Sequence, residues 1–263
     1  MAHPAAAGHA ATIRRFFDAE ALEYAQARER QPSFVAQREL VLGMLPARLE
    51  RVLDVGCGPA LMADPLLRRG AQVCGIDAAD EMIRLGRARM RHHPLAARLL
   101  LRVGSADRLP FGDASFDAAV AMGVLEYLDD RAAGLAEIAR VLRPNGVLVA
   151  TVPSCLSAYH LARSVWTGAR GAARMLLRRA APPFEAFPTH RCIPWRLDAE
   201  LERAGLRKTE GRFCNFIFFP LHELVPGASA ALNRRLSWLG ASPGLAWLGT
   251  QYVVRAIKRS LQR

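Results

Sequence analysis

The residues VLDVGCGPA, from Val52 to Ala60, place a carboxylate and two glycines directly after a short apolar run. Asp54, Gly56 and Gly58 are the residues of this stretch whose types and spacing suit ligand binding. A bare backbone corner that opens a helix brings amide groups close to a ligand. The corner alone is compatible with a pyrophosphate, with a nucleoside or with no ligand.

Two further residues favour a nucleoside over a pyrophosphate. The dinucleotide fingerprint has Gly or Ala three residues after its second glycine, where the helix must pack closely, and this chain has Leu61 there. Asp77 ends the segment CGID, 21 residues after Gly56. An acidic side chain at that place accepts hydrogen bonds from ribose hydroxyls.

A third carboxylate follows the next apolar run. Asp107 lies in GSADRLPFGDASFD and can accept a hydrogen bond from the exocyclic amine of an adenine. Asp54 or Asp77 alone could equally be a helix N-cap, and Gly56 alone a plain turn. Acids at three successive strand ends form a more specific pattern than any pair of glycines.

The elements that must position these acids are visible as a regular alternation. Between residues 51 and 152, helical patterns separate five short apolar runs, which are RVLDV, QVCGI, LLLRV, FDAAVAM and GVLVATV. This alternation predicts an α/β fold with right-handed crossovers and a doubly wound, mostly parallel sheet. FCNFIFF and QYVVRAIK are expected to complete seven strands as a final hairpin, with an insertion at about residues 220–248. In such sheets ligands bind beyond the carboxyl ends of the strands.

The flanks of this core have a different character. Residues 1–45 predict a loose tail of about a dozen residues and then two helices broken near Pro32, whereas residues 46–263 form the main domain. Residues 154–190 form a long basic insertion. Residues 1–152 carry 19 Lys or Arg and 18 Asp or Glu, but residues 153–263 carry 17 and 6. This excess of positive charge indicates an anionic partner.

The expected location is the cytoplasm, and contact with a membrane surface is one of two interpretations of the basic insertion. The chain shows no cleavable signal and no apolar run of about twenty residues. Its five cysteines show neither C-x-x-C pairing nor a His and Cys cluster at zinc spacing, so no metal site is predicted.

Together the motifs resemble a known family. VLDVGCGPA, GID, GSADRLPFGDASFD, VLEYL and RVLRPNGVLVATV, in this order and spacing, are similar to the class I S-adenosylmethionine-dependent methyltransferases of the quinone-biosynthesis type (methyltransferase type 11). The resemblance covers about residues 52–152. It implies a Rossmann-like fold and S-adenosylmethionine as cofactor. Many members have a third glycine where this chain has Ala60, and we expect the methyl group to be tolerated.

The resemblance also implies roles for individual residues. Asp54, Gly56 and Gly58 surround the methionine part of the cofactor and Asp77 binds the ribose. The adenine is held by Ala106 and Asp107. The other expected cofactor-binding residues are Ala78, Met122 and Tyr24, the last of these together with Arg28.

The catalytic base is less clearly marked than the cofactor pocket. Methyl transfer in line to a nucleophile depends mainly on holding the acceptor close and away from water, with a base for poor nucleophiles. Candidates are Glu126 after the fourth strand, His160 after the fifth and His190 at the end of the basic insertion. Each of the two histidines could instead be an ordinary surface or lid residue.

The basic insertion allows two interpretations. On a helix, Arg163, Arg170, Arg174 and Arg178 lie beside an apolar face that contains Trp166. The segment is either a lid over the active site or a contact with an anionic membrane, and both can hold together. A hydrophobic or aromatic small molecule, such as a quinone precursor, a lipid or a polyketide, is the expected acceptor of methylation at oxygen or carbon.

Two rival functions remain open from the sequence. The Arg-rich C-terminal part could bind nucleic acid phosphates, although the chain contains no RNA-binding aromatic motif. Alternatively, the protein binds the cofactor without catalysis. We favour the small-molecule methyltransferase.

Overall fold

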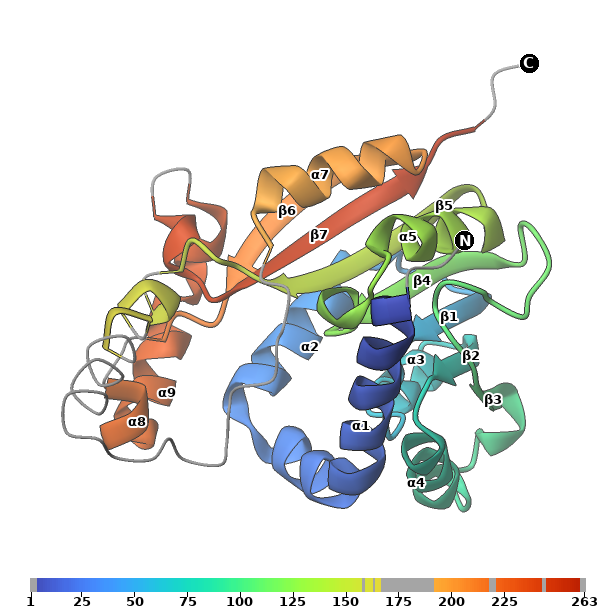
Figure 1. Cartoon of the computed structure of the whole chain (residues 1–263), viewed down its shortest axis with the longest axis horizontal. Helices are drawn as coiled ribbons and strands as arrows, with labels where there is room; N and C mark the ends of the chain where they lie inside the picture. The colour runs from blue at the N-terminus through green and yellow to red at the C-terminus, as the bar shows by residue number, and fades with distance from the viewer. Residues whose placement is uncertain are drawn as a thin grey trace.

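Every one of the five apolar runs forms a strand of one sheet. The computed structural model describes residues 4–157, 159–162, 164–166, 192–217, 221–242 and 245–260. These residues form a seven-stranded sheet in the order β3-β2-β1-β4-β5-β7-β6 (Figure 1). The strands are β1 (Arg51–Val55), β2 (Gln72–Asp77), β3 (Leu99–Val103), β4 (Phe116–Met122), β5 (Leu142–Pro153), β6 (Leu206–Cys214) and β7 (Gln251–Lys258).

The pairing directions make the sheet mostly parallel. Strands β1 to β5 pair in parallel, and β7 pairs antiparallel with both β5 and β6. The chain runs outward from β1 to β2 and β3, and then returns to place β4 on the other side of β1. The predicted doubly wound fold is confirmed, and this reversal creates a crevice at the carboxyl ends of β1 and β4.

Helices cover both faces of the sheet. They are α1 (Pro4–Arg30), α2 (Pro32–Met44), α3 (Ala63–Arg68), α4 (Asp80–Met90), α5 (Arg131–Val141), α7 (Pro194–Arg203), α8 (Leu221–Leu224) and α9 (Pro226–Leu236). Short 3-10 helices are η1 (Ala96–Arg98), η2 (Leu125–Tyr127), η3 (Ser237–Ala241) and η4 (Ala246–Leu248). Buried side chains of α5 and α7 pack on one face, and those of α2, α3 and α4 pack on the other.

The structure differs from the sequence prediction in two segments. The supposed N-terminal tail is helical from Pro4, because a proline at the first helical position and an alanine-rich run both favour helix. The final hairpin of β6 and β7 is present, but the bounds expected for its first strand are wrong: β6 begins at Leu206 and ends at Cys214, and shares only Phe213 and Cys214 with FCNFIFF. The next residue, Asn215, has a φ of +60°, which turns the chain out of the sheet.

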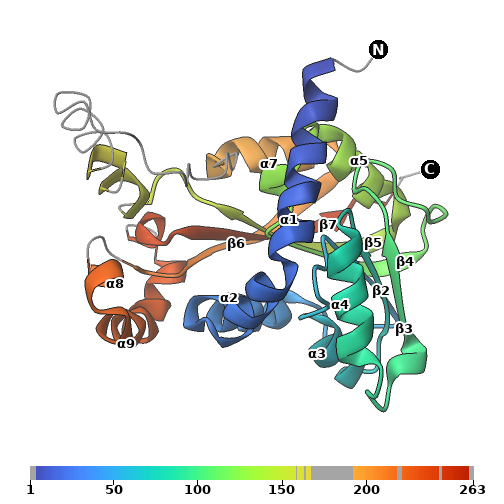
Figure 2. The same cartoon turned by 60° about the horizontal axis from the view of Figure 1, so that its bottom comes forward.

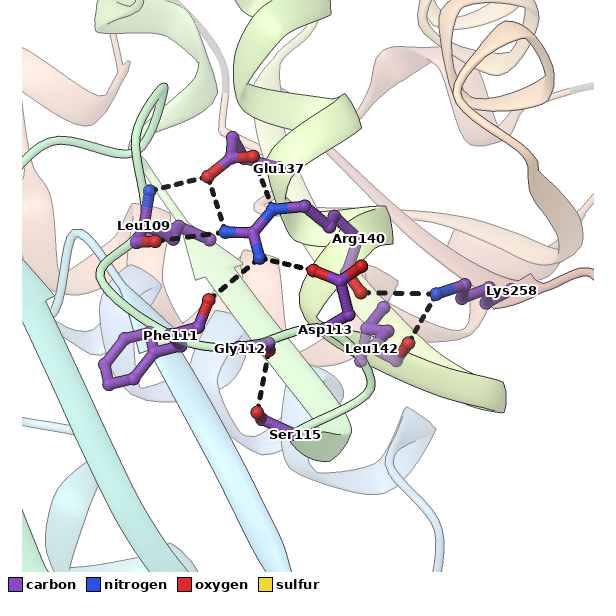
Figure 3. A network of polar contacts seen from close by, with 9 residues as sticks. All are labelled: Leu109, Phe111, Gly112, Asp113, Ser115, Glu137, Arg140, Leu142 and Lys258. Atoms are coloured by element: carbon purple, nitrogen blue, oxygen red, sulfur yellow. Dashed lines mark hydrogen bonds and ion pairs between the residues drawn. The ribbon is translucent and has the colours of Figure 1, made fainter.

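The loop between β3 and β4 is held by a polar network around Arg140 of α5 (Figure 3). The guanidinium group donates to the carbonyl oxygens of Leu109 and Phe111, at 3.0 and 2.8 Å, and to Asp113 at 2.7 Å. Glu137 accepts from Arg140 at 2.7 Å and from the Leu109 amide at 2.8 Å. The network fixes the loop that also carries the predicted adenine-binding residues.

Candidate functional site

A pocket of about 160 Å³ lies at the carboxyl ends of β1, β2 and β4. Most of the predicted cofactor-binding residues line it, namely Gly56, Gly58, Asp77, Ala78, Ala106, Asp107, Met122 and Tyr24. These residues come from five separate parts of the chain, and the topology brings them together. The pocket therefore occupies the crevice that the doubly wound order creates.

Asp77 is fixed by the backbone around it. One carboxylate oxygen accepts from the amide of Gly58 at 2.8 Å, and the other accepts from the amide of Ala79 at 2.9 Å. A carboxylate has about four acceptor positions, so each oxygen can accept a further hydrogen bond from a ligand. Burial raises the pKa of Asp77 despite these bonds.

Asp54 lies beneath the pocket rather than on its surface. Its side chain is 3% exposed and is not part of the pocket lining. Burial, reinforced by the nearby Asp77, raises the pKa of Asp54 to about 8. Asp77 lies at the pocket surface with Asp54 behind it, so a positively charged ligand in the pocket would favour the ionised form of both side chains.

The two glycines of the corner have different reasons to be glycine. Gly56 has a φ of +66°, and a Cβ atom there would lie 2.6 Å from Val124, so packing excludes any side chain. Gly58 has a φ of +51°, but the nearest atom to a Cβ is Met82 Sδ at 4.0 Å. The absence of a side chain at Gly58 therefore leaves open space in the pocket. Ala60 also takes the left-handed conformation, with φ +60°, where a glycine would be unstrained.

Helix α1 forms a roof over the pocket, of which the sequence predicted only Tyr24 and Arg28. Ile13, Arg14 and Phe17 line the pocket from above, and α1 lies alongside α4 (Figure 2). Arg14 forms an ion pair with Asp80 at the start of α4. The apolar positions Ile13, Phe17, Ala21 and Tyr24 recur at helical spacing, which is the signal that could have identified the roof.

An aromatic cluster closes the roof against the end of β4. The ring of Phe17 makes edge contacts with Tyr24 and Tyr127, with centroids 5.6 and 5.3 Å apart. Arg28 donates to the hydroxyl of Tyr24 at 3.1 Å. Tyr24 therefore lines the pocket as predicted, whereas Arg28 supports it from behind.

Two of the three predicted catalytic residues, Glu126 and His160, do not line this pocket. Glu126 of η2 is 5% exposed, and burial raises its pKa to about 7. Its Oε2 atom accepts no hydrogen bond within the described structure. His160 contacts the ring of Tyr159 and does not line the pocket. His190 falls outside the described residues.

The predicted membrane-facing arginines cannot be placed. Arg163, Arg170, Arg174 and Arg178 lie outside the described residues, as does most of the insertion at residues 154–190. In the described part of the chain, no helix is both long and apolar enough to cross a bilayer. The same part contains no group of three or more His, Cys, Asp or Glu side chains arranged to hold a metal ion.

The strand order and the acid-lined pocket define a Rossmann-like α/β protein with a site for a nucleoside-bearing ligand. Comparison with known proteins agrees with this fold and this kind of site. Residues 53–150 match the family model described as a methyltransferase domain. A ubiquinone biosynthesis O-methyltransferase of Xanthomonas oryzae pv. oryzae is 34% identical over 167 residues, which are 61% of this chain and 68% of that protein.

Two further similarities extend this result. The O-methyltransferase cnsE of Penicillium expansum is 38% identical over 113 residues, which are 43% of this chain and 41% of that protein. The methyltransferase in the complex with the Haloferax volcanii Trm112 methyltransferase activator shares the fold, with a TM-score of 0.66. The two are 20% identical, and the match covers 95% of this chain and 99% of that one.

The chain belongs to the class I S-adenosylmethionine-dependent methyltransferases, in the methyltransferase type 11 group. S-adenosylmethionine is the cofactor of this class. The pocket fits it in charge, because the cofactor carries a sulfonium, the half-buried Asp77 lines the pocket, and Asp54 behind it ionises more readily near a cation. The pocket fits it in shape as well, since Gly58 leaves open space beside the free acceptor positions of Asp77.

Proposed function

We propose that the protein transfers a methyl group from S-adenosylmethionine to a hydrophobic or aromatic small molecule, at oxygen or carbon. The observation that carries the proposal is the pocket at the carboxyl edge, in which Asp77 and Gly58 lie under an aromatic roof. Two relatives that are O-methyltransferases by name support an oxygen acceptor. Acceptors of quinone-precursor, lipid or polyketide type remain our candidates.

The roof residues support an apolar, planar acceptor. Phe17, Tyr24 and Tyr127 line the pocket together with Met122 at the end of β4. The ring of Phe17 contacts both tyrosine rings edge to face. Aromatic rings favour offset or edge contacts with another ring, and they exclude water from a reacting group. We therefore infer that the acceptor lies between the roof and the end of β4.

The cofactor and the protein contribute different parts of the chemistry. When bound, S-adenosylmethionine supplies a methyl group on a positively charged sulfur. The residues of this chain hold the acceptor in line and exclude water, as methyl transfer requires. We propose that Asp77 holds the ribose, that Ala106 and Asp107 hold the adenine, and that Asp54 favours the positive charge.

We further propose that Glu126 accepts the proton of an acceptor hydroxyl. Its buried carboxylate has one oxygen without a partner in the described structure, and burial raises its pKa to about 7. A general base works best with a pKa near the operating pH. Arg28 and Arg131 partly offset the effect of burial, which keeps a fraction of Glu126 ionised at neutral pH.

The substitution Glu126→Gln tests this role. It keeps the shape of the side chain but cannot accept the proton, so kcat should fall by about a hundredfold while binding of the demethylated cofactor is unchanged. The exposed carboxylate of Glu23 provides the control, and Glu23→Gln should leave kcat unchanged. Equal kcat for Glu126→Gln and wild type, or the same dependence of kcat on pH in both proteins, would exclude Glu126 as the base.

The methyl transfer itself is tested with labelled S-adenosylmethionine and a set of acceptors. Phenolic and catecholic lipids should accept the label, and neither RNA nor protein should. Cofactor binding without transfer to any acceptor would instead identify a non-catalytic family member. We place the protein in the cytoplasm, where an acceptor of this kind is reached at a membrane surface.

A further inference from the structure

A second groove lies on the same edge of the sheet as the cofactor pocket, between α2 and α9. We call it the α2–α9 groove; it measures about 590 Å³ and shares no lining residue with the cofactor pocket. Its floor is the end of β6, at Phe213 and Cys214, and its far wall is the helical insertion between β6 and β7. Figure 2 shows α9 beside α2.

The charge around the groove is positive. Arg30, Arg212 and Arg234 line it, and Glu39 is the one carboxylate among its lining residues in the described structure. Arg212 is paired with Glu210 at 2.6 Å. Arg30 and Arg234 form no ion pair within the described part of the chain, so their charges remain available to a ligand.

The rest of the lining is largely apolar. The apolar side chains in the lining include Val35 and Leu40 of α2, Phe213 of β6 and Trp238 of η3. Burial raises the pKa of the Cys214 thiol to about 12, so this floor residue stays protonated and behaves as an apolar side chain. Trp238 is 68% exposed, which is unusual for so large an apolar side chain.

The floor also contains an unsatisfied polar group. Asn215 is 5% exposed, and its Oδ1 atom has no hydrogen-bond partner in the described structure. A buried acceptor without a partner costs about 1–3 kcal/mol, and native structures contain few of them. Such an atom at the floor of a groove is consistent with a partner supplied by a bound molecule or its water.

The walls are held rigidly in place. The Asn233 side chain of α9 accepts from the amide of Phe216 at 2.7 Å. Gly240 of η3 packs so closely on β6 that a Cβ atom there would lie 2.2 Å from the carbonyl oxygen of Phe213. The groove is therefore preformed, which reduces the entropy lost on binding.

We propose that the α2–α9 groove binds an anionic amphiphile, a molecule with an apolar body and one phosphate or carboxylate group. The apolar body lies along Val35, Leu40, Phe213 and Trp238, and the anion lies between Arg30 and Arg234. The ligand is either a free molecule of this chemistry or an anionic lipid headgroup at a membrane.

The experiment uses the full chain with two arms. Calorimetry measures binding of octyl phosphate below its micelle concentration, with octanol as the neutral counterpart. Flotation measures partition onto vesicles of phosphatidylglycerol and of phosphatidylcholine. Binding in the first arm identifies a free ligand, and binding in the second arm alone identifies the lipid surface.

Variants separate the groove from general charge. The pair Arg30→Gln and Arg234→Gln should weaken binding by about tenfold or more. A matched pair, Arg48→Gln and Arg207→Gln, removes two exposed arginines from the opposite edge of the sheet and should change binding by less than about twofold. Trp238→Ser should weaken binding by several fold, and its exposure means that the fold is retained.

Three results would overturn the proposal: octanol binding as tightly as octyl phosphate, an equal loss from both arginine pairs, or no binding in either arm. The proposal goes beyond the proposed methyl transfer, since neither arm contains S-adenosylmethionine. Its failure is therefore distinguishable from failure of the cofactor assignment.

Discussion

At the scale of single residues, the site depends on two carboxyl groups whose ionised form is destabilised by burial. Asp77 keeps its place through two backbone amides, while Asp54 lies behind it with a pKa raised to about 8. Both are more stable as carboxylates when a cation lies nearby. With the cofactor bound as we propose, its sulfonium charge would give these two residues a favourable interaction that a neutral nucleoside lacks.

This arrangement predicts a pH dependence of cofactor binding. Below pH 8 Asp54 is protonated in the free protein, and a cationic ligand favours its carboxylate, so binding releases a proton. Affinity for S-adenosylmethionine should rise from pH 6 to pH 8 and then level off. Calorimetry in buffers of different ionisation enthalpy measures the proton release. Asp54→Asn should remove the slope; an unchanged slope in that variant would assign the proton to another group.

Gly56 gives a prediction about packing. Gly56→Ala adds left-handed strain and a contact 2.6 Å from Val124, so the free energy of unfolding should fall by about 3 kcal/mol. Gly70→Ala is the control, because Gly70 has a φ of +86° but no atom within 4 Å of a Cβ position. It should lose only about 1 kcal/mol in thermal or denaturant unfolding. Equal losses of unfolding free energy in the two variants would mean that Val124 moves to accommodate the new methyl group.

At the scale of elements, the site depends on loops that are held from outside it. The loop after β3 carries Ala106 and Asp107, and Arg140 of α5 fastens it at Leu109 and Phe111. Helix α1 is fastened in the same way, since Asp18 accepts from the amide of Glu81 at the start of α4. Neither anchor belongs to the pocket lining, yet each holds an element that does.

Arg140→Met should therefore affect both stability and binding. It removes several charge-assisted hydrogen bonds at a side chain that is about one third exposed, so unfolding should require about 2 kcal/mol less. Affinity for the cofactor should weaken by several fold because the adenine-side loop loosens. The control Arg143→Met removes only an exposed pair with Glu50 and should change neither quantity measurably. Normal cofactor affinity in Arg140→Met would show that the loop needs no anchor.

The sequence predicted those elements whose burial imposes an unambiguous pattern. The central strands β1 and β4 are buried on both faces, so they appear as largely apolar runs and begin and end where expected. The edge strand β3 also has the expected bounds, although most of its residues are exposed. The roof was harder to predict because α1 has a weak apolar face and joins the site only through tertiary contacts. The end of β6 was missed because Asn215 turns the chain within an apolar run.

The residues of the candidate site also differ in how well the sequence predicted their positions. Asp77 and Gly58 follow strand ends, where the topology itself directs them to the pocket. Glu126 and His160 follow strands too, but their orientation depends on η2 and on the segment after β5. Sequence spacing therefore predicted which strand-end residues line the pocket better than it predicted the positions of Glu126 and His160.

At the scale of the whole molecule, two separate cavities share one edge of a single sheet. The parallel half builds the cofactor pocket, and the antiparallel hairpin of β6 and β7 builds the α2–α9 groove. The N-terminal helices connect them, since α1 covers the first and α2 forms a wall of the second. Of the basic residues in 153–263, Arg212 and Arg234 belong to the groove lining.

The most direct test is calorimetric titration of the purified chain with S-adenosylmethionine and its demethylated product. Wild type should bind both with one site per chain, and Asp77→Asn should bind both at least tenfold more weakly. Asp64→Asn removes an exposed carboxylate of α3 outside the pocket and should bind like wild type. No heat with either ligand, or equal affinity of Asp77→Asn and wild type, would contradict the assignment of this pocket.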